Sequence, residues 1–160
     1  LLQNNPDTNI CITGDMNENI DEYYQIENKY TTALMPAEAL ISDKNIYTKN
    51  TLFYTGDTAS DCFKKASDGF ELVLFSPWIN TEQKGSYAYR GKWDTPDHFF
   101  LSPGLTRKTG LRYVSFEVIQ KEQLLNTEGY PAAWRTFSLR GYSDHLPLLL
   151  TLQLPFSEGG

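Results

Sequence analysis

Cysteines, long apolar runs and glycine-rich loops are scarce or absent in this sequence of 160 residues, and each shortage excludes a class of protein. Two cysteines, Cys11 and Cys62, are too few for a disulfide framework, and each is expected to be a buried free thiol. No cysteine–histidine spacing typical of zinc occurs, and no loop matches a P-loop or dinucleotide fingerprint. The longest apolar stretch, residues 146–154, has roughly half the length of a membrane span.

Positive charge is also in short supply. The chain has 14 Lys and Arg residues against 20 Asp and Glu residues, which gives a formal net charge of −6. A protein that binds duplex nucleic acid without sequence preference usually has a broad basic face, and this composition argues against one. A phosphorylated substrate is still compatible with the charge, because a bound divalent cation reverses the sign of the local field.

The composition that remains suits one globular domain. Hydrophobic residues make up 40% and charged residues 21%, which excludes disorder and collagen-like repeats. A domain of this size buries about 70% of its unfolded surface without help from disulfides or metals, so we expect a soluble chain. Residues 1–5 show neither a start methionine nor the zones of a signal peptide. We therefore expect residues before Leu1 to be missing, and the localisation stays unknown.

Alternating apolar and β-branched residues predict a sheet protein with few helices. The predicted strands are residues 8–13, 70–75, 86–90, 98–101, 113–119 and 146–154, the last of them a core strand. Short helices are predicted at 21–30 and, after a Ser-Asp cap, at 60–65. A turn at 91–96 and an irregular connection at 120–140 join the later strands. The predicted class is α+β, built on a sheet or a sandwich.

Three polar clusters lie where predicted strands begin or end. Binding and catalytic residues are usually found in such loops on a rigid scaffold. Asp15 and Asn17 follow the first strand in the run GDMN. Residues two apart on an extended chain face the same side, so a carboxylate and an amide converge there. The carboxylate can take a proton from water and the amide can orient that water. A simple turn is the alternative interpretation, because glycine, aspartate and asparagine are ordinary turn residues.

The cluster SDH comes directly before the last strand and contains Asp144 and His145. An ionised aspartate beside a buried strand needs a partner, a hydrogen bond or a metal. Alternatively, Ser143 and Asp144 form a local cap on the backbone.

The third cluster, WDTPD, leads into the strand at 98–101. A hydrogen bond from an imidazole to Asp97 would fix the tautomer of a catalytic histidine, and a surface turn is the alternative. His98 is expected to point to the opposite face of the strand as a structural or surface histidine. The three tryptophans, one of which is in this cluster, are expected at the core or its rim.

Oxygen donors dominate the combined set, which consists of Asp15, Asn17, Asp97, Asp144 and the imidazole of His145. Hard oxygen ligands suit Mg²⁺ or Mn²⁺, which commonly bind one or two carboxylates together with substrate phosphates.

Taken in order, the three clusters resemble the endonuclease/exonuclease/phosphatase superfamily, the DNase-I-like group of metal-dependent phosphoesterases. The run ICITGDMNE is similar to the Gly-Asp-Phe-Asn motif of that family, with Met16 in place of the aromatic residue. YAYRGKWDTPDHFFLS resembles its Trp-x-x-x-Asp strand motif, and GYSDHLPLLLTL resembles its terminal Ser-Asp-His-x-Pro motif. The resemblance extends from about residue 8 to residue 154 and is loose over 19–81.

The resemblance implies a hydrolase in which water attacks phosphorus in line, in a phosphodiester or a phosphomonoester, with Mg²⁺ or Mn²⁺ as cofactor. Asp15 would activate or orient the water, and Asn17 would position the water and a phosphoryl oxygen. Asp144 would bind the metal. His145, oriented by Asp97, would bind the scissile phosphate and stabilise its developing charge. The substrate would be a small phosphorylated molecule, a lipid head group or a nucleic acid.

The family fold implies that this chain is part of a larger domain. That fold is a four-layer αββα sandwich of two similar halves with the site between them. Residues 1–155 resemble its C-terminal half, with a mostly antiparallel sheet and few helices, and 156–160 form a tail. The metal-binding Asn and Glu of the N-terminal half have no counterpart before Asp15, so that half is expected as a partner. The alternative is a non-catalytic binding or assembly module that retains half of a phosphoesterase site.

Overall fold

A computed structural model covers the chain and describes residues 5, 8–27, 30, 32–39, 51–56, 63–66, 69–107 and 110–154, with the backbone alone at 63–66 and 69–72. Within these ranges strands far outnumber helices. The predicted α+β class, mostly sheet with few helices, is confirmed.

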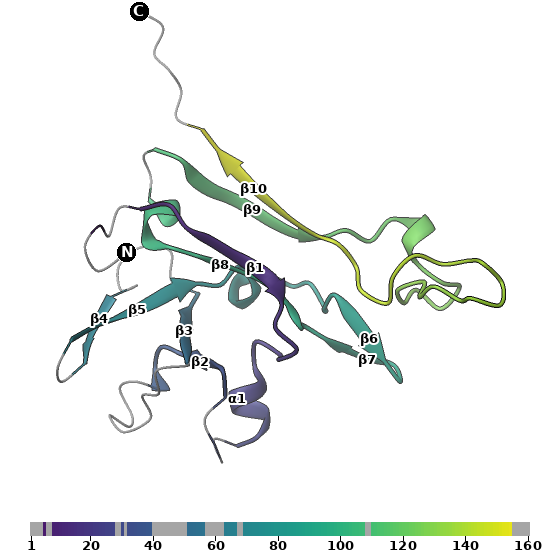
Figure 1. Cartoon of the computed structure of the whole chain (residues 1–160), viewed down its shortest axis with the longest axis horizontal. Helices are drawn as coiled ribbons and strands as arrows, with labels where there is room; N and C mark the ends of the chain where they lie inside the picture. Colours follow the sequence, from purple (N-terminus) through teal and green to yellow (C-terminus); the bar gives the residue numbers. More distant parts are fainter. Residues whose placement is uncertain are drawn as a thin grey trace, which may run out of the picture.

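The largest unit is a six-stranded mixed sheet (Figure 1). Its strands are β1 (Cys11–Asp15), β2 (Leu34–Pro36), β3 (Leu52–Thr55), β4 (Phe63–Ala66), β5 (Gly69–Phe75) and β8 (Asp97–Leu101). The main path runs in the order β1–β8–β5–β3–β2, and β4 pairs with β5 off this path. Strands β2, β3 and β5 are mutually parallel, whereas β1, β8, β5 and β4 are joined by antiparallel pairings.

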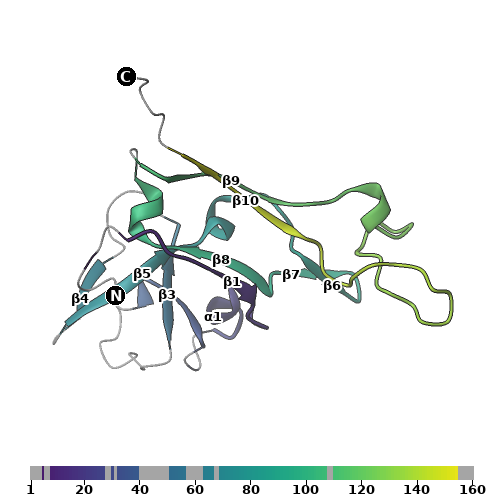
Figure 2. The ribbon, with the colours of Figure 1, turned by 45° about the horizontal axis from the view of Figure 1, so that its top comes forward.

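Two antiparallel ribbons accompany the main sheet. One consists of β6 (Tyr87–Tyr89) and β7 (Lys92–Asp94), and the other of β9 (Arg112–Val118) and β10 (Leu148–Gln153). Figures 1 and 2 show β9 and β10 running alongside β1 and β8, while the segment between β9 and β10 extends past the β6–β7 ribbon. The site residues that precede β10 therefore come back toward the main sheet from this extension.

Helical segments are short. The α-helix α1 spans Glu22–Gln25, and three 3₁₀ segments follow at η1 (Pro77–Asn80), η2 (Pro103–Thr106) and η3 (Glu122–Leu124). Proline begins η1 and η2, where its fixed φ suits a first helical turn. Helix α1 is shorter than the predicted 21–30, because Glu27 has a φ of 56° and leaves the right-handed helical region.

The main core lies where the large sheet, η1 and the β9–β10 ribbon meet. Tyr54 and Phe100 pack with ring centroids 6.4 Å apart, and the Trp78 ring meets Phe116 edge-on at 4.8 Å. These four side chains are almost entirely buried. Burial of a large apolar side chain contributes about 1.5–3 kcal/mol, so this cluster holds the ribbon against the sheet.

Two local predictions are wrong. The helix predicted at 60–65 is contradicted where the structure describes it, because Phe63–Ala66 is strand β4. Pairing with β5 satisfies its backbone groups, and this outweighs a weak helix preference. The turn predicted at 91–96 contains strand β7. The true turn is at Arg90 and Gly91, whose φ values of 50° and 80° are those of a tight hairpin turn.

Burial was also misjudged at two strands. Strand β10 is only in part the predicted core strand, since its alternate leucines pack against buried clusters whereas Leu149 is 45% exposed. Among the described residues, β10 pairs with β9 alone. Cys11 is an exposed free thiol, because β1 is an outer strand of the sheet, and Cys62 lies outside the described residues. No helix in the described ranges is long and apolar enough to cross a membrane.

Candidate active site

Four chain segments meet at one rim of the main sheet, and backbone pairing brings them together. The last residue of β1, Asp15, lies opposite the first residue of β8, Asp97. An isolated bridge pairs Tyr87 of β6 with His145, and Leu146 N donates to Ser86 O at 2.7 Å. Polar residues from segments far apart in the sequence therefore share this rim.

The centre of the rim is an Asp97–His145 pair. Asp97 Oδ2 lies 2.7 Å from His145 Nδ1 and accepts a hydrogen bond from the Ser86 hydroxyl at 2.5 Å. Both side chains are half-buried, with 28% of His145 and 20% of Asp97 exposed. The Tyr87 ring packs against the imidazole at 4.9 Å between centroids. The ring is thereby held in one orientation with Nδ1 on Asp97, which leaves Nε2 as the second functional nitrogen.

Asp15 joins this pair from β1. One ligand atom each from Asp15, Asp97 and His145 lies within 4.8 Å of the other two. Asp15 Oδ1 accepts a hydrogen bond from Asn17 N at 2.9 Å, and Asn17 has a φ of 52°. Met16 N donates to Pro96 O at 2.7 Å, which fixes the GDMN turn against the loop before β8. Asp15 therefore ends strand β1, Asn17 lies in the bend that follows, and both belong to the rim.

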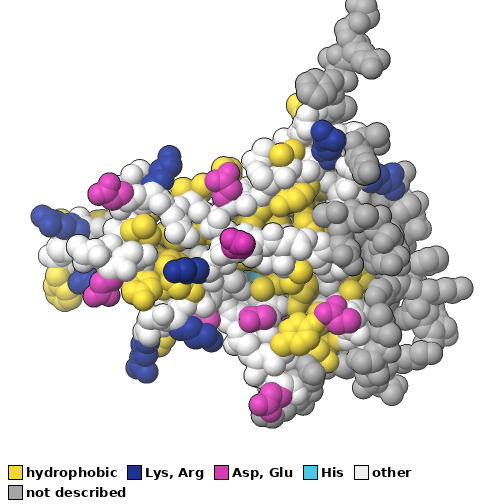
Figure 3. Space-filling view, turned by 180° about the vertical axis from the view of Figure 1, so that it is seen from behind, with side chains coloured by type: hydrophobic (Ala, Val, Ile, Leu, Met, Phe, Trp, Pro, Cys, Tyr) yellow, Lys and Arg dark blue, Asp and Glu magenta, His cyan; other side chains and the backbone are white. Residues whose placement is uncertain are grey.

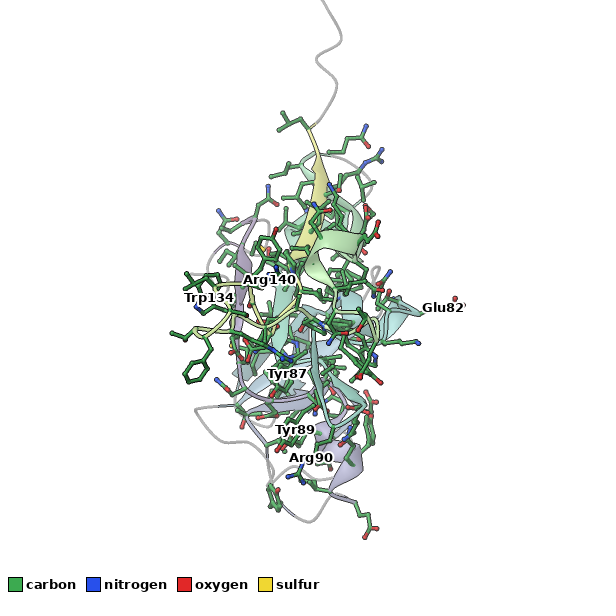
Figure 4. All side chains as sticks on the ribbon, turned by 90° about the vertical axis from the view of Figure 1, so that its right-hand side faces the viewer. Glu82, Tyr87, Tyr89, Arg90, Trp134 and Arg140 are labelled. Atoms are coloured by element: carbon green, nitrogen blue, oxygen red, sulfur yellow. The ribbon has the colours of Figure 1, made fainter. Side chains whose placement is uncertain are left out.

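A pocket of about 330 Å³ opens beside the pair. Its lining residues are Asn17, Glu18, Asn19, Glu22, Tyr87, Asp94, Pro96, Asp144 and His145. Four carboxylates and two amides therefore surround the space, so its field is negative and its donors are hard oxygens. Figure 4 views this end of the molecule and labels Tyr87 at its middle.

Three of the four pocket carboxylates already have structural partners. Glu18 accepts the backbone N–H groups of residues 33 and 34 at 3.0 and 2.8 Å. Glu22 Oε2 accepts a hydrogen bond from Asn19 N at 3.2 Å, and Asp94 Oδ1 forms an ion pair with Lys92 Nζ at 3.5 Å. Within the described part of the chain, the exposed Asp144 carboxylate forms no hydrogen bond or ion pair. Asp144 is therefore the pocket carboxylate with all its oxygen lone pairs available.

The pocket wall depends on Asn19, a residue that the sequence analysis missed. Its amide donates to Asp94 Oδ1 at 3.0 Å and accepts from Thr95 N at 2.5 Å. Thr95 Oγ1 accepts a hydrogen bond from Ile20 N at 2.9 Å, so these three hydrogen bonds join the two loops. Ser86 and Tyr87 were missed as well. Both residues contact the Asp97–His145 pair only in the folded chain. In the sequence, their position shortly before the WDTPD cluster is the feature that could have indicated them.

His98 has a different place from His145. It is fully buried, and its Nε2 lies 2.8 Å from Glu18 O. Burial in apolar surroundings lowers the pKa of His98, although the Glu18 carbonyl and the nearby Asp97 and Asp15 charges oppose this shift. A neutral ring that donates from Nε2 leaves Nδ1 without a partner among the described residues. The His98 ring thus holds the backbone of Glu18, which lines the pocket, from the buried side.

The donor set fits a divalent cation. The pocket is lined by hard oxygen donors, among them the available Asp144, and the second oxygen of Asp15 lies on the rim near His145. Asp97 fits less well as a ligand, because its Oδ2 already accepts two hydrogen bonds. These contacts suit a carboxylate that orients an imidazole.

Comparison with known proteins gives one family match. A family model described as Endonuclease/Exonuclease/phosphatase family matches residues 58–154, which is more than half of the chain. The matched range contains Asp97, Asp144 and His145, whereas Asp15 and Asn17 lie before it. No curated protein and no solved structure matches the chain.

Proposed function

The chain belongs to the endonuclease/exonuclease/phosphatase family, and we propose that it takes part in hydrolysis of phosphate esters with a divalent cation. The observation that carries this proposal is the Asp97–His145 pair at 2.7 Å, held by Ser86 and Tyr87 beside the Asp15 carboxylate. An imidazole fixed in this way can present Nε2 to a charged substrate oxygen.

In the proposed mechanism His145 Nε2 donates a hydrogen bond to a phosphoryl oxygen of the scissile group. Asp97 keeps the ring in position through its contact with Nδ1, so that Nε2 is the nitrogen available to the substrate. His145 thereby stabilises the charge that grows on the phosphoryl oxygens as the leaving group departs.

Asp15 and Asn17 act on the attacking water. The Asp15 oxygen that is not bonded to Asn17 N can accept a proton from water or orient it. The Asn17 side chain lines the pocket and can position the water and a phosphoryl oxygen. The hydrogen bond from Asn17 N to Asp15 Oδ1 fixes Asp15 relative to the Asn17 backbone, which reduces the entropy lost on reaching the reactive geometry.

Asp144, together with Asp15, would hold Mg²⁺ or Mn²⁺. The bound cation would neutralise charge on the phosphoryl oxygens and polarise the P–O bond. The four pocket carboxylates repel an anionic substrate in its absence, so we expect substrate binding to require the metal. The proposed substrates are a small phosphorylated molecule, a lipid head group or a nucleic acid.

A second candidate function is a binding or assembly module without turnover. The use of Glu18, Glu22 and Asp94 for backbone and side-chain contacts favours it, because few carboxylate oxygens then remain for a metal. In the enzyme interpretation, residues 1–155 form the C-terminal portion of a domain whose N-terminal half supplies further ligands. The outer position of β1, with all five residues exposed, supports a covering partner there.

The test is hydrolysis of bis(p-nitrophenyl) phosphate with Mn²⁺, Mg²⁺ or EDTA, combined with calorimetric titration of Mn²⁺. Asp144→Asn is compared with Glu82→Gln, an exposed carboxylate that projects away from the site in Figure 4. We expect turnover that EDTA abolishes, and loss of both turnover and Mn²⁺ binding in Asp144→Asn alone. Normal Mn²⁺ binding by Asp144→Asn would exclude Asp144 as the ligand. Mn²⁺ binding without turnover would favour the binding module.

A further inference from the structure

The segment between β9 and β10 contains an ordered hairpin, residues 132–142, which we call the arm. Tyr142 N donates to Ala132 O at 2.7 Å, and Arg135 N donates to Arg140 O at 2.8 Å. Ser138 N closes the tip by donating to Arg135 O at 3.2 Å. Ala132 N is anchored in turn on Leu124 O at 2.8 Å. Because its backbone groups are paired in this way, the arm has a defined conformation. It extends away from the sheets (Figure 1).

The arm exposes an unusual amount of apolar surface. Phe137 is 106% exposed and Leu139 is 72% exposed, and both lie at the tip. Trp134 and Tyr142, further back on the arm, are 53% and 63% exposed. Figure 4 shows Trp134 projecting from the edge of the molecule. Single exposed apolar residues are common on protein surfaces, but four large ones on one hairpin indicate a surface that binds something.

The charge on the arm is opposite to that of the chain. Between Glu128 and Asp144 the only charged residues are Arg135 and Arg140, whereas the chain as a whole has a net charge of −6. Both arginines are exposed, and within the described ranges neither guanidinium has a hydrogen bond or an ion pair. Figure 3 shows hydrophobic and basic side chains, with some acidic ones among them, at the end of the molecule that bears the arm.

The order of these groups along the arm is informative. The bridge between Arg135 and Arg140 places both arginines at one level, directly behind the tip. The tip itself, residues 136–139, is uncharged and contains Phe137 and Leu139. An apolar tip with cations behind it matches the layers of a phospholipid surface, in which anionic phosphates lie outside the acyl chains.

We propose that the arm docks on a bilayer that contains anionic phospholipid. Phe137 and Leu139 enter the boundary between head groups and acyl chains, and Arg135 and Arg140 bind lipid phosphates. Trp134 and Tyr142 lie at head-group level, where amphipathic rings are favoured. Asp144 and His145 follow the arm directly in the chain, so docking holds the pocket near the membrane surface. The docking itself stands without the proposed function, because it requires no turnover.

A nucleic acid fits the same surface less well. Bound single strands need rings on which bases stack and a basic groove that follows the backbone. The arm has exposed rings, but its two arginines at one level form no basic groove along a strand, and the lining of the adjacent pocket contains four carboxylates. The apolar tip and the two arginines therefore favour a lipid surface.

The test is co-sedimentation with vesicles of phosphatidylcholine alone and of phosphatidylcholine mixed with phosphatidylglycerol. We expect binding to the mixed vesicles, and at least about tenfold weaker binding by the double variant Phe137→Ser/Leu139→Ser. Arg135→Gln/Arg140→Gln should lose the preference for anionic vesicles. The matched control is Leu154→Ser, since Leu154 is 73% exposed at the far end of β10. It should bind as the unchanged chain does.

A second measurement guards against misfolded variants and other partners. Trp134 fluorescence should shift to shorter wavelength with mixed vesicles, and Trp134→Phe should abolish the shift while its circular dichroism spectrum stays unchanged. Absence of vesicle binding, or equal binding by Phe137→Ser/Leu139→Ser, would overturn the proposal. So would binding of a single-stranded oligonucleotide without binding of vesicles. The proposal would also be overturned if copies of the chain associate through the arm and do not bind vesicles.

Discussion

The two faces of strand β8 differ in burial and in chemistry. On one face His98 and Phe100 are fully buried and stack with centroids 5.2 Å apart and an angle of 13° between their planes. On the other face Asp97 and Phe99 are only half-buried, and Asp97 faces the pocket rim. Because side chains alternate along a strand, one strand can form part of the core and part of a polar site.

The two histidines make the same contrast in chemical terms. His98 is buried, bonds a backbone carbonyl and has a lowered pKa, which keeps its ring neutral. His145 is half-exposed and bonds a carboxylate, which fixes the orientation of its ring beside the pocket. The same side chain is therefore a structural support in one place and a candidate catalytic group in the other. Four substitutions test these differences between the two histidines and between the two faces of β8.

The largest effect is expected on the rim. His145→Ala should lower turnover of bis(p-nitrophenyl) phosphate about a thousandfold, because it removes the donor to the phosphoryl oxygen. The melting temperature should change little, since the ring is half-exposed and Asp97 keeps its bond from Ser86. Steady-state kinetics with Mn²⁺ and a thermal melt measure both. Turnover close to that of the unchanged chain would remove His145 from the mechanism.

The next effect is expected on the buried face. Phe100→Ala should lower the free energy of unfolding by about 3–5 kcal/mol, because it leaves a cavity beside Tyr54. Phe99→Ala, on the half-buried face, is the matched control and should cost less. Urea denaturation compares the two. Equal losses would mean that the two faces of β8 do not differ in packing as described.

A smaller effect is expected from the residue that orients the imidazole. Asp97→Asn should lower turnover about a hundredfold, since an amide at this position does not hold the proton on Nδ1. As a positioning residue, Asp97 should affect kcat more than KM and should move the pH profile of kcat. Kinetics across pH test this, and a change in KM alone would contradict the role.

The smallest effect is a pH dependence of stability from His98. Its pKa in the folded chain is lowered from the ordinary value of 6.5, so the unfolded chain binds the proton more readily. Stability is therefore full above pH 6.5 and declines as the pH falls from there toward the lowered pKa. His98→Gln keeps a donor for the Glu18 carbonyl but does not titrate, and it should remove this part of the pH dependence. Urea titrations at several pH values measure the difference, and an unchanged slope would exclude His98 as its source.

The sequence alone predicted much of the sheet. The alternating patterns at 70–75, 98–101 and 113–119 correspond to β5, β8 and β9, because side-chain alternation is a local property. The helix predicted at 60–65 and the turn predicted at 91–96 were wrong, because β4 and β7 form by pairing with other strands. Strand existence was therefore predictable where the local pattern was strong, and not where pairing decided it.

For the candidate site, the sequence determined which residue types follow which strands, and hence the oxygen-rich set of Asp15, Asn17, Asp97 and Asp144 with one imidazole. The family resemblance implied that Asp97 orients His145, whereas the tertiary fold brings these residues, 48 positions apart, to 2.7 Å and adds Ser86 and Tyr87 around the pair. Only the tertiary fold decided that His98 is buried while its neighbour faces the pocket. The physical reason is that hydrophobic periodicity extends over a few residues, whereas sheet order and register are fixed by packing of the whole core.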